Sequence, residues 1–227
     1  MRLVVIRPQP GCDATVDGAR ALGLDARGFP LFAVRPVAWQ LPEPGSFDAV
    51  LVGSVNALRH GGDKLAALSG MPAYAVGETT ASACREADMR VIATGQGGLQ
   101  QVLNCLDPAH RTLLRLAGKA RVPLDPPGGV TIIERIVYAS EPLPMPPALA
   151  DLLSEPAVVA LHSAEAARHF RRECETRAVD PSLLGLVAIG PRVAQAAGGG
   201  WRAVRWVETA TEAALLALAD EMCKEPG

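Results

Sequence analysis

Small and polar residues follow several apolar runs in this sequence, where a strand would give way to a helix or a turn. Small residues there let backbone N–H groups at a helix N-terminus approach an anion, and the carboxyl ends of parallel strands are where α/β proteins bind ligands. Taken singly, each Ser or Thr is explained as an ordinary helix N-cap. Their recurrence along the chain favours an extended anionic ligand. The candidate binding residues are Ser54, Asn56, Gly77, Thr80, Gly118, Lys119, Ser163 and Gly190.

Tyr138 is one of two tyrosines in the chain, and it lies in an extended apolar segment, residues 130–147. A tyrosine on a strand usually packs its ring against neighbours and keeps its hydroxyl at the edge. The alternative role is a proton donor on the wall of a cleft. Composition does not choose between these two roles.

Two motifs that would indicate nucleotide binding are incomplete. Leu113 stands where a Walker A loop ending at Gly118-Lys119 needs its first glycine. The stretch TGQGGLQ (94–100) has Gln100 where the third glycine of G-x-G-x-x-G belongs. Nucleotide binding is therefore unsupported.

Serine and histidine recur six residues apart, as Ser54 with His60 and Ser163 with His169. On a helix this spacing points the two side chains to different faces, which argues against a Ser–His catalytic pair. The two histidines are expected on the solvated surface. No histidine has the spacing typical of a metal site.

The composition is that of an ordinary globular protein. The 227 residues are 49% hydrophobic and 20% charged, and the net charge of −2 lacks the basic excess of a nucleic-acid binder. The cysteines are odd in number and scattered without C-x-x-C, which argues against a disulfide frame or a zinc site; they are Cys12, Cys84, Cys105, Cys174 and Cys223. The N-terminus MRLVVIRP has no signal-peptide pattern, and no apolar run is long enough to span a bilayer. We expect a cytoplasmic protein that binds neither nucleic acid nor membrane, and a monomer.

Short runs rich in Val, Ile and Leu alternate with Ala-rich helical stretches along the whole chain. Such alternation is typical of an α/β fold whose parallel sheets are covered by helices on both faces. The apolar runs are 3–6, 48–54, 73–77, 90–94, 112–118, 157–163, 186–190 and 203–207.

A long internal repeat accompanies this alternation. Residues 77–103 and 190–216 align without a gap, and residues 49–60 resemble 158–169. Any two doubly wound units share some likeness, but the gapless stretch favours duplication and hence two similar lobes.

Two extended, Pro-flanked segments interrupt the alternation, at 29–44 and 130–147. If they pair, they form a two-stranded antiparallel ladder between the lobes. The first lobe would then be discontinuous, comprising 1–33 and 143–227. The second, 43–133, would be inserted, with bridging strands at 34–42 and 134–142. Two narrow crossings of this kind predict a hinge and a cleft.

These features together resemble the uroporphyrinogen-III synthase family. Each motif is weak alone, and the specificity comes from their order. They are VVIRP (4–8), FDAVLVGSVNAL (47–58), AVGETTASACREADMRV (75–91), LLRLAGKAR (113–121), IVYAS (136–140), VALHSAEAARHF (159–170), VAIGPRVAQA (187–196) and TEAALLAL (211–218).

The resemblance implies two α/β lobes joined by a two-stranded ladder. It also implies a lyase of tetrapyrrole biosynthesis that needs no metal or organic cofactor. Its substrate would be hydroxymethylbilane, a linear tetrapyrrole polycarboxylate. The enzyme would cyclise it to uroporphyrinogen III with loss of water and inversion of ring D, chiefly by holding the flexible chain so that the correct carbon reacts.

The resemblance also assigns roles to individual residues. Tyr138 matches the family's candidate acid, which assists the departure of hydroxide. Thr80 matches the Thr of the family's Gly-x-x-Thr turn. Where the family commonly has a second Thr, this chain has Val193, preceded by Arg192. Arg192 is therefore a candidate contact for a substrate carboxylate.

Two other interpretations remain open from sequence. One is a non-catalytic two-lobed module that binds an anion or a tetrapyrrole, which the loss of a Thr at position 193 would suit. The other is an interaction scaffold built from repeats, without a buried ligand. Turnover of hydroxymethylbilane distinguishes the enzyme from both.

Overall fold

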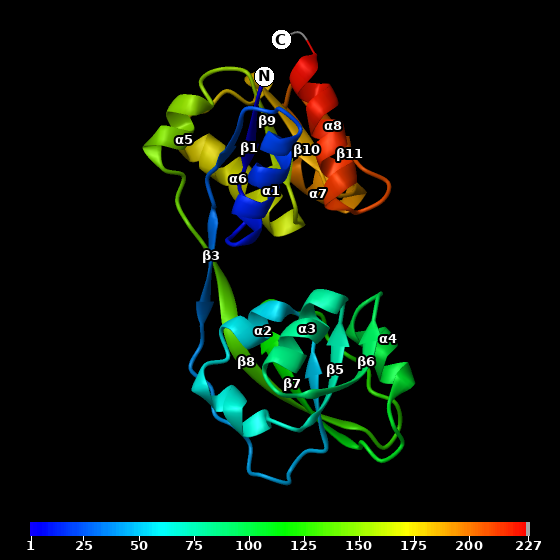
Figure 1. Cartoon of the computed structure of the whole chain (residues 1–227). Coiled ribbons are helices and arrows are strands. Elements are labelled where there is room, and N and C mark those ends of the chain that lie inside the picture. Colours follow the sequence, from blue (N-terminus) through cyan, green and yellow to red (C-terminus); the bar gives the residue numbers. More distant parts are fainter. Residues whose placement is uncertain (226–227) are drawn as a thin grey trace. The chain divides into compact units, whose positions relative to one another are not determined.

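The computed structural model describes Met1–Glu225 and divides the chain into two compact units (Figure 1). Unit 1 combines Met1–Ala33 with the chain from Glu141 onward, and unit 2 is Val34–Ser140. Each unit contains a sheet with helices packed against it, so the predicted α/β class is confirmed.

Unit 1 is a doubly wound parallel sheet. The strand order is β2-β1-β9-β10-β11, which is the 2-1-3-4-5 order of flavodoxin-like folds. The strands are β1 (Arg2–Val5), β2 (Ala26–Gly28), β9 (Ala157–Leu161), β10 (Leu184–Ala188) and β11 (Ala203–Trp206). Helices α1 (Gly11–Ala21) and α8 (Glu212–Lys224) share one apolar cluster with the sheet. A second cluster joins the sheet to α5 (Pro147–Leu152), α6 (Ala164–Thr176) and α7 (Pro191–Ala197).

Unit 2 has a six-stranded sheet in the order β3-β8-β7-β4-β5-β6. The strands are β3 (Phe32–Pro36), β4 (Ala49–Val52), β5 (Pro72–Val76), β6 (Arg90–Gly95), β7 (Thr112–Gly118) and β8 (Thr131–Pro142). One face carries α2 (Val55–Arg59), α3 (Glu78–Glu86) and the 3-10 helix η1 (Asp63–Leu68). The other carries the short α4 (Leu99–Val102) and η2 (Leu103–Cys105).

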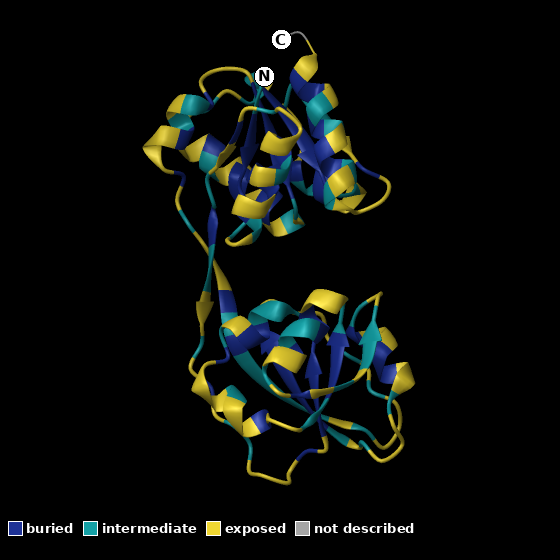
Figure 2. Ribbon diagram, in the orientation of Figure 1, coloured by how far each residue is buried: buried dark blue, intermediate teal, exposed yellow. Residues whose placement is uncertain are grey.

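Continuous apolar sequence explains the strands at the centre of each sheet. AVLV of β4, AVVAL of β9 and LGLVA of β10 are buried at every position, as strands covered on both faces must be. Figure 2 shows these strands as the buried interior of each unit, with the exposed residues mostly on helices and loops.

The internal repeat corresponds to a shared βαβαβ topology. β4-α2-β5-α3-β6 in unit 2 matches β9-α6-β10-α7-β11 in unit 1, and in both sheets these three strands are neighbours in sequence order. Ser54 caps α2 and Ser163 caps α6, each accepting a hydrogen bond from a backbone N–H of the first turn. Gly77 and Gly190 occupy the N-cap positions of α3 and α7.

The two extended segments become neighbouring strands, β3 and β8, whose arrows run in opposite directions (Figure 1). β3 is shorter than the predicted extended segment and ends at Pro36. Beyond it, Val37 N donates to Val137 O, and Trp39 is buried with its indole N–H donating to Gly61 O at 2.8 Å. Burial of the indole thus replaces strand pairing in the second half of this segment.

The connection between β7 and β8 is unusual for parallel neighbours because it contains no helix. Parallel strands are usually joined by a helical crossover that covers the sheet. Here residues 119–130 form an irregular, Pro-rich loop. This loop, called the strap below, leaves part of one sheet face without a helix.

Within Met1–Glu225, no helix has the length and apolar character that crossing a membrane would require. In the same residues, His, Cys, Asp and Glu side chains form no group of three or more that could hold a metal ion.

Candidate functional site

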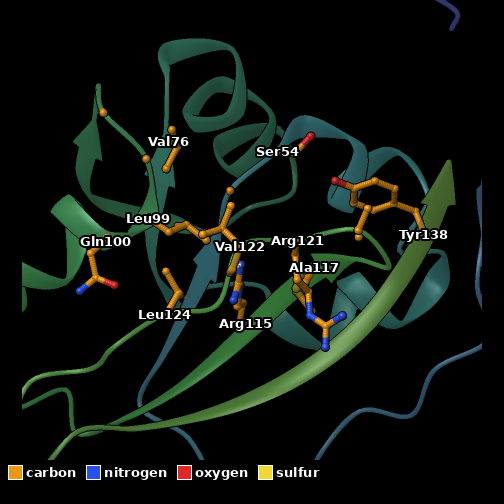
Figure 3. A pocket seen from close by; sticks show the side chains of 16 residues that line it. Ser54, Val76, Leu99, Gln100, Arg115, Ala117, Arg121, Val122, Leu124 and Tyr138 are labelled. Carbon is orange, nitrogen blue, oxygen red and sulfur yellow. Dashed lines mark hydrogen bonds between the residues drawn. The ribbon is translucent and has the colours of Figure 1, made fainter. Parts of the chain in front are cut away.

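A pocket of about 340 Å³ opens in unit 2 where a helical crossover is missing (Figure 3). From β4 to β8, the strands follow the Rossmann-like spatial order 3-2-1-4-5, so the connections reverse direction between β4 and β7. Ligands of open α/β sheets bind outside the carboxyl ends of the strands at this reversal. The pocket lies there, since it is lined by the residues after β4, the end of β7, the strap, the loop before α4 and β8.

Tyr138 reaches the pocket because of an irregularity in strand pairing. β7 and β8 run in register up to Ala117 opposite Ile136, and then the register shifts so that Tyr138 lies opposite Gly118. A β-bulge of this kind re-aims a side chain. The Tyr138 ring lies directly against Gly118, since a Cβ built there would be 2.6–2.8 Å from three of its atoms, including the hydroxyl oxygen. Figure 3 shows Tyr138 on the pocket wall with Ser54 nearby.

Arg115 brings a buried positive charge to the same pocket. Its side chain projects from the middle of β7, and the residue is 5% exposed. Nη1 donates to Glu134 Oε1 at 2.7 Å, and Nη2 donates to the carbonyl of Val122 in the strap at 2.9 Å. Burial lowers the pKa of Arg115, and the nearby Glu134 carboxylate opposes this effect.

Glu134 is shared between two arginines. Arg121 Nε donates to its second oxygen at 2.7 Å, and this hydrogen bond is the main cause of a lowered pKa for Glu134. Arg121 also donates to the carbonyl of Lys119. The Glu134 carboxylate therefore neutralises one of the two guanidinium groups. Arg115, Arg121 and Glu134, called the cluster below, together keep a net positive charge.

The pocket lining combines positive charge with apolar surface. Its described residues include two cations, Arg115 and Arg121, and no Asp or Glu. Such a lining suits a ligand that combines negative charge with apolar surface. The apolar lining residues are Val76, Leu99, Leu116, Ala117, Ala120, Val122 and Leu124.

Ser54, Gly118 and Tyr138 are the predicted site residues that line this pocket. Asn56 lies beside it in the first turn of α2, where its backbone N–H donates to Ser54 Oγ at 3.3 Å. His60 ends the same helix, with its ring centroid 6.4 Å from that of Tyr138. Burial lowers the pKa of His60. It is half-buried beside the tyrosine, whereas the sequence predicted a solvated position.

Gly77, Thr80 and Lys119 are, like Asn56, not among the described residues that line the pocket. Gly77 begins α3 with φ of 76°, a left-handed conformation that favours glycine. Thr80 is 5% exposed and faces the core with Ala81. The Lys119 side chain is exposed, and its backbone N–H donates to Tyr138 O at 2.9 Å.

Ser163, Gly190 and Arg192 lie in unit 1, at the starts of α6 and α7. Arg192 is exposed in the first turn of α7. Val193, at the repeat position of Thr80, is 9% exposed and belongs to the apolar core. Both copies bury this position, so valine, which has no hydroxyl that needs a partner, fits there as well as threonine does.

The reversal point of unit 1, between β1 and β9, holds a carboxylate of the protein itself. Glu212, in the first turn of α8, accepts hydrogen bonds from Arg7 Nη1 at 3.0 Å and from the Thr15 hydroxyl. His162 Nε2 lies 3.3 Å from both carboxylate oxygens. The His162 hydrogen bond is the main reason that the pKa of Glu212 falls to about 2, with Thr15 and Arg7 acting in the same direction against partial burial.

Glu212→Gln tests this cluster through the pH dependence of stability. The folded pKa of about 2 lies below the usual 4.5, so the ionised carboxylate stabilises the fold above pH 4.5, and this contribution is lost as pH falls toward 2. At pH 7 we expect the variant to be less stable by about 1 kcal/mol, because the group is partly exposed. Between pH 4.5 and 2 the difference in free energy of unfolding between wild type and Glu212→Gln should shrink, as measured by urea unfolding. A difference that stays constant across this range would contradict the assignment.

His169 was predicted on the surface, and this is wrong. It is 6% exposed, its Nε2 lies 2.8 Å from Leu143 O, and its ring meets Phe32 edge-on at 5.1 Å. The partners lie far away in sequence, so spacing to Ser163 could not reveal them.

The candidate pocket includes several residues that the sequence predictions missed. Gly97 and Gly98 line it, although TGQGGLQ resembles only an incomplete nucleotide-binding motif. Arg115 is not among the predicted site residues, although a single charge flanked by leucines in the apolar run TLLRLAG is a recognisable signal. Arg121 ends the motif LLRLAGKAR (113–121), whereas the rest of the strap, residues 122–130, carries no motif.

Comparisons with known proteins agree with this architecture. The family model described as uroporphyrinogen-III synthase HemD matches residues 13–217. A crystal structure of uroporphyrinogen-III synthetase from Helicobacter pylori 26695 is similar, with a TM-score of 0.67, 18% identity, and 98% of this chain and 100% of that chain covered.

A mutant uroporphyrinogen III synthase from the extremely thermophilic bacterium Thermus thermophilus gives a TM-score of 0.56 at 19% identity, covering 99% of this chain and 100% of the other. At these identities the two structures show likeness of fold. No curated protein sequence matches the chain.

Proposed function

Because the chain belongs to the uroporphyrinogen-III synthase family, we propose that it binds hydroxymethylbilane in the pocket of unit 2 and that Tyr138 is its general acid. The family's enzymes are cyclising lyases of tetrapyrrole biosynthesis, and the match over residues 13–217 carries this activity to the chain. The position of Tyr138, on the wall of a positively charged pocket, supports the residue assignment.

The first chemical step is loss of the hydroxymethyl hydroxyl. We assign to Tyr138 the donation of its phenolic proton to the departing oxygen, so that water leaves and an azafulvenium cation forms. The substituted carbon of ring D then attacks, and the spirocyclic intermediate fragments and recloses with ring D inverted. The proton released when the last pyrrole regains aromaticity returns to the Tyr138 phenolate.

The pocket supplies binding groups suited to this substrate. Arg115 and Arg121 attract carboxylates, and Val76, Leu99 and Leu124 offer apolar surface to pyrrole rings. Positioning matters most, because hydroxymethylbilane closes spontaneously to the uninverted type I isomer. Holding the reacting carbons together favours the inverted product.

Ser54, Asn56, Gly77, Thr80, Gly118 and Lys119 are proposed to help bind the substrate in unit 2. Ser163, Gly190 and Arg192 are proposed to do so in unit 1. Support for them is the placement of Ser54, Gly77, Ser163 and Gly190 at strand-to-helix turns. Thr80 is buried and its backbone N–H donates to Gly77 O at 3.1 Å, so its proposed role is to shape the turn.

Turnover of freshly prepared hydroxymethylbilane tests the activity. After oxidation of the products to porphyrins, chromatography separates the type I and type III isomers. We expect type III isomer with the purified protein and type I without it. Type I alone, formed at the spontaneous rate, would contradict the proposal and favour a non-catalytic tetrapyrrole-binding homologue.

Arg192→Ala tests the proposed carboxylate contact in unit 1. Arg192 is exposed in the first turn of α7, so we expect KM to rise about three- to tenfold, in keeping with a solvent-screened charge contact. Arg177→Ala is the matched control. Arg177 is also an exposed arginine of unit 1, but it lies at the C-cap of α6, where a helix ends and does not begin. An unchanged KM in Arg192→Ala would remove Arg192 from the binding site.

A further inference from the structure

One donor of the buried Arg115 guanidinium has no partner among the described residues. Nη1 and Nη2 are both used, but the Nε–H makes no hydrogen bond although it is fully buried. Leaving a buried donor unpaired costs about 1–3 kcal/mol, and more for a charged group. Native proteins rarely accept this cost without a ligand, a water or a function.

The fold holds Arg115 rigidly in this state. Its backbone belongs to β7, which is paired with β4 on one side and β8 on the other. Its two terminal nitrogens are fixed by Glu134 on β8 and by the Val122 carbonyl in the strap. The direction of the Nε–H is therefore set before any ligand arrives, which lowers the entropic cost of binding one.

The surroundings of Arg115 select an anion. Arg115 lines both the candidate pocket and a second, adjoining pocket, and Arg121 is common to both. Figure 3 shows Arg115 in the pocket floor, between Leu124 and Ala117 and below Val122. The single carboxylate in the cluster, Glu134, already accepts from both arginines. One positive charge therefore remains for a ligand.

We propose that the Arg115 Nε–H is a binding site for one carboxylate of the tetrapyrrole, buried in the floor of the unit 2 pocket. This inference rests on the proposed function and adds a specificity-determining residue to it. A carboxylate there would complete the hydrogen bonding of Arg115 and neutralise the remaining charge of the cluster. The site would therefore anchor the bilane beneath the strap through one of its carboxylates.

Arg115→Lys separates this site from general attraction by charge. Lysine keeps the positive charge but lacks the Nε–H, so we expect KM to rise about tenfold while kcat changes less than about threefold. Arg85→Lys is the matched control. Arg85 lies on α3, donates to Glu78 at 2.6 Å and is not among the described residues that line the pocket, so we expect KM to change less than about threefold.

A measurement on the wild-type protein makes the test independent of variant folding. The ¹H–¹⁵N resonance of the Arg115 Nε–H, assigned through bonds, should move downfield on titration with uroporphyrinogen III, because a carboxylate accepts its hydrogen bond. A resonance that stays fixed while amides of Gly118 and Ala120 shift would overturn the inference. So would a KM that rises no more in Arg115→Lys than in Arg85→Lys. An enzyme that still makes type III isomer in that case would leave the proposed function intact.

Discussion

Tyr138→Phe is expected to lower kcat by about 10²- to 10⁴-fold, the usual contribution of a general acid, while leaving the enzyme slowed and not inactive. The ring lies against Gly118 and packs on the unit 2 core, so phenylalanine keeps the packing and removes only the hydroxyl. The rate of type III formation under saturating hydroxymethylbilane measures the effect.

The chain's other tyrosine provides the matched control. The hydroxyl of Tyr74 is bonded to His110 Nδ1 at 2.8 Å and to Asp107 N at 2.9 Å, and its ring is buried in the sheet. Tyr74→Phe should therefore cost about 1–3 kcal/mol of stability and leave kcat unchanged below the unfolding temperature. Wild-type turnover in Tyr138→Phe would remove Tyr138 from the chemistry.

Gly118→Ala is expected to lower kcat by about 10²-fold, because the new methyl group would push the tyrosine ring from its place and a displacement of about 1 Å has this effect. The Cβ would lie 2.6–2.8 Å from two ring carbons and the hydroxyl oxygen of Tyr138, so the side chain would have to shift to make room. Overpacking should also lower stability by about 1–3 kcal/mol. Gly199→Ala is the control, since a Cβ at that position meets nothing within 4 Å.

A double variant shows whether Gly118 acts through the phenol. If it does, Gly118→Ala should have little further effect on kcat in the Tyr138→Phe background, because the group it displaces is already absent. Two losses that multiply would show that Gly118 contributes by another route, such as close approach of the backbone to the substrate.

The elements that depend on local sequence could be predicted. Fully apolar runs such as AVVAL became buried parallel strands, and serines before helices became N-caps. The repeat indicated that two halves share one topology, because the same turns recur at the same spacing. Gly198 ends α7 with φ of 71°, and the glycine run in AAGGGW (196–201) is a local sequence signal for such a helix end.

Features made by distant partners could not be predicted. Arg7 and Glu212 are 205 positions apart in the chain, and their ion pair depends on strand order that no local pattern specifies. The segment after β3 has strand-like alternation, but burial of Trp39 against Gly61 decides its path. The pocket exists because the strap contains no helix, which becomes visible only once β7 and β8 are known to be parallel neighbours.

Proposing a role for Tyr138 required two structural features that sequence does not show, the register shift beside it and the pocket that it lines. Sequence left both packing and proton donation open for Tyr138, with packing the more usual role of a tyrosine on a strand. The shift at Ala117 and Gly118 turns its ring toward a positively charged lining, which favours the second role without excluding contacts with the core.

A crystal structure of the protein with a linear bilane, in which methyl replaces the reactive hydroxymethyl group, tests the central claim most directly. We predict that the methyl-bearing ring occupies the unit 2 pocket with this substituent facing the Tyr138 hydroxyl, and that one carboxylate lies within hydrogen-bond distance of Arg115 Nε. A bilane bound elsewhere, with Tyr138 out of reach of its methyl group, would contradict the account.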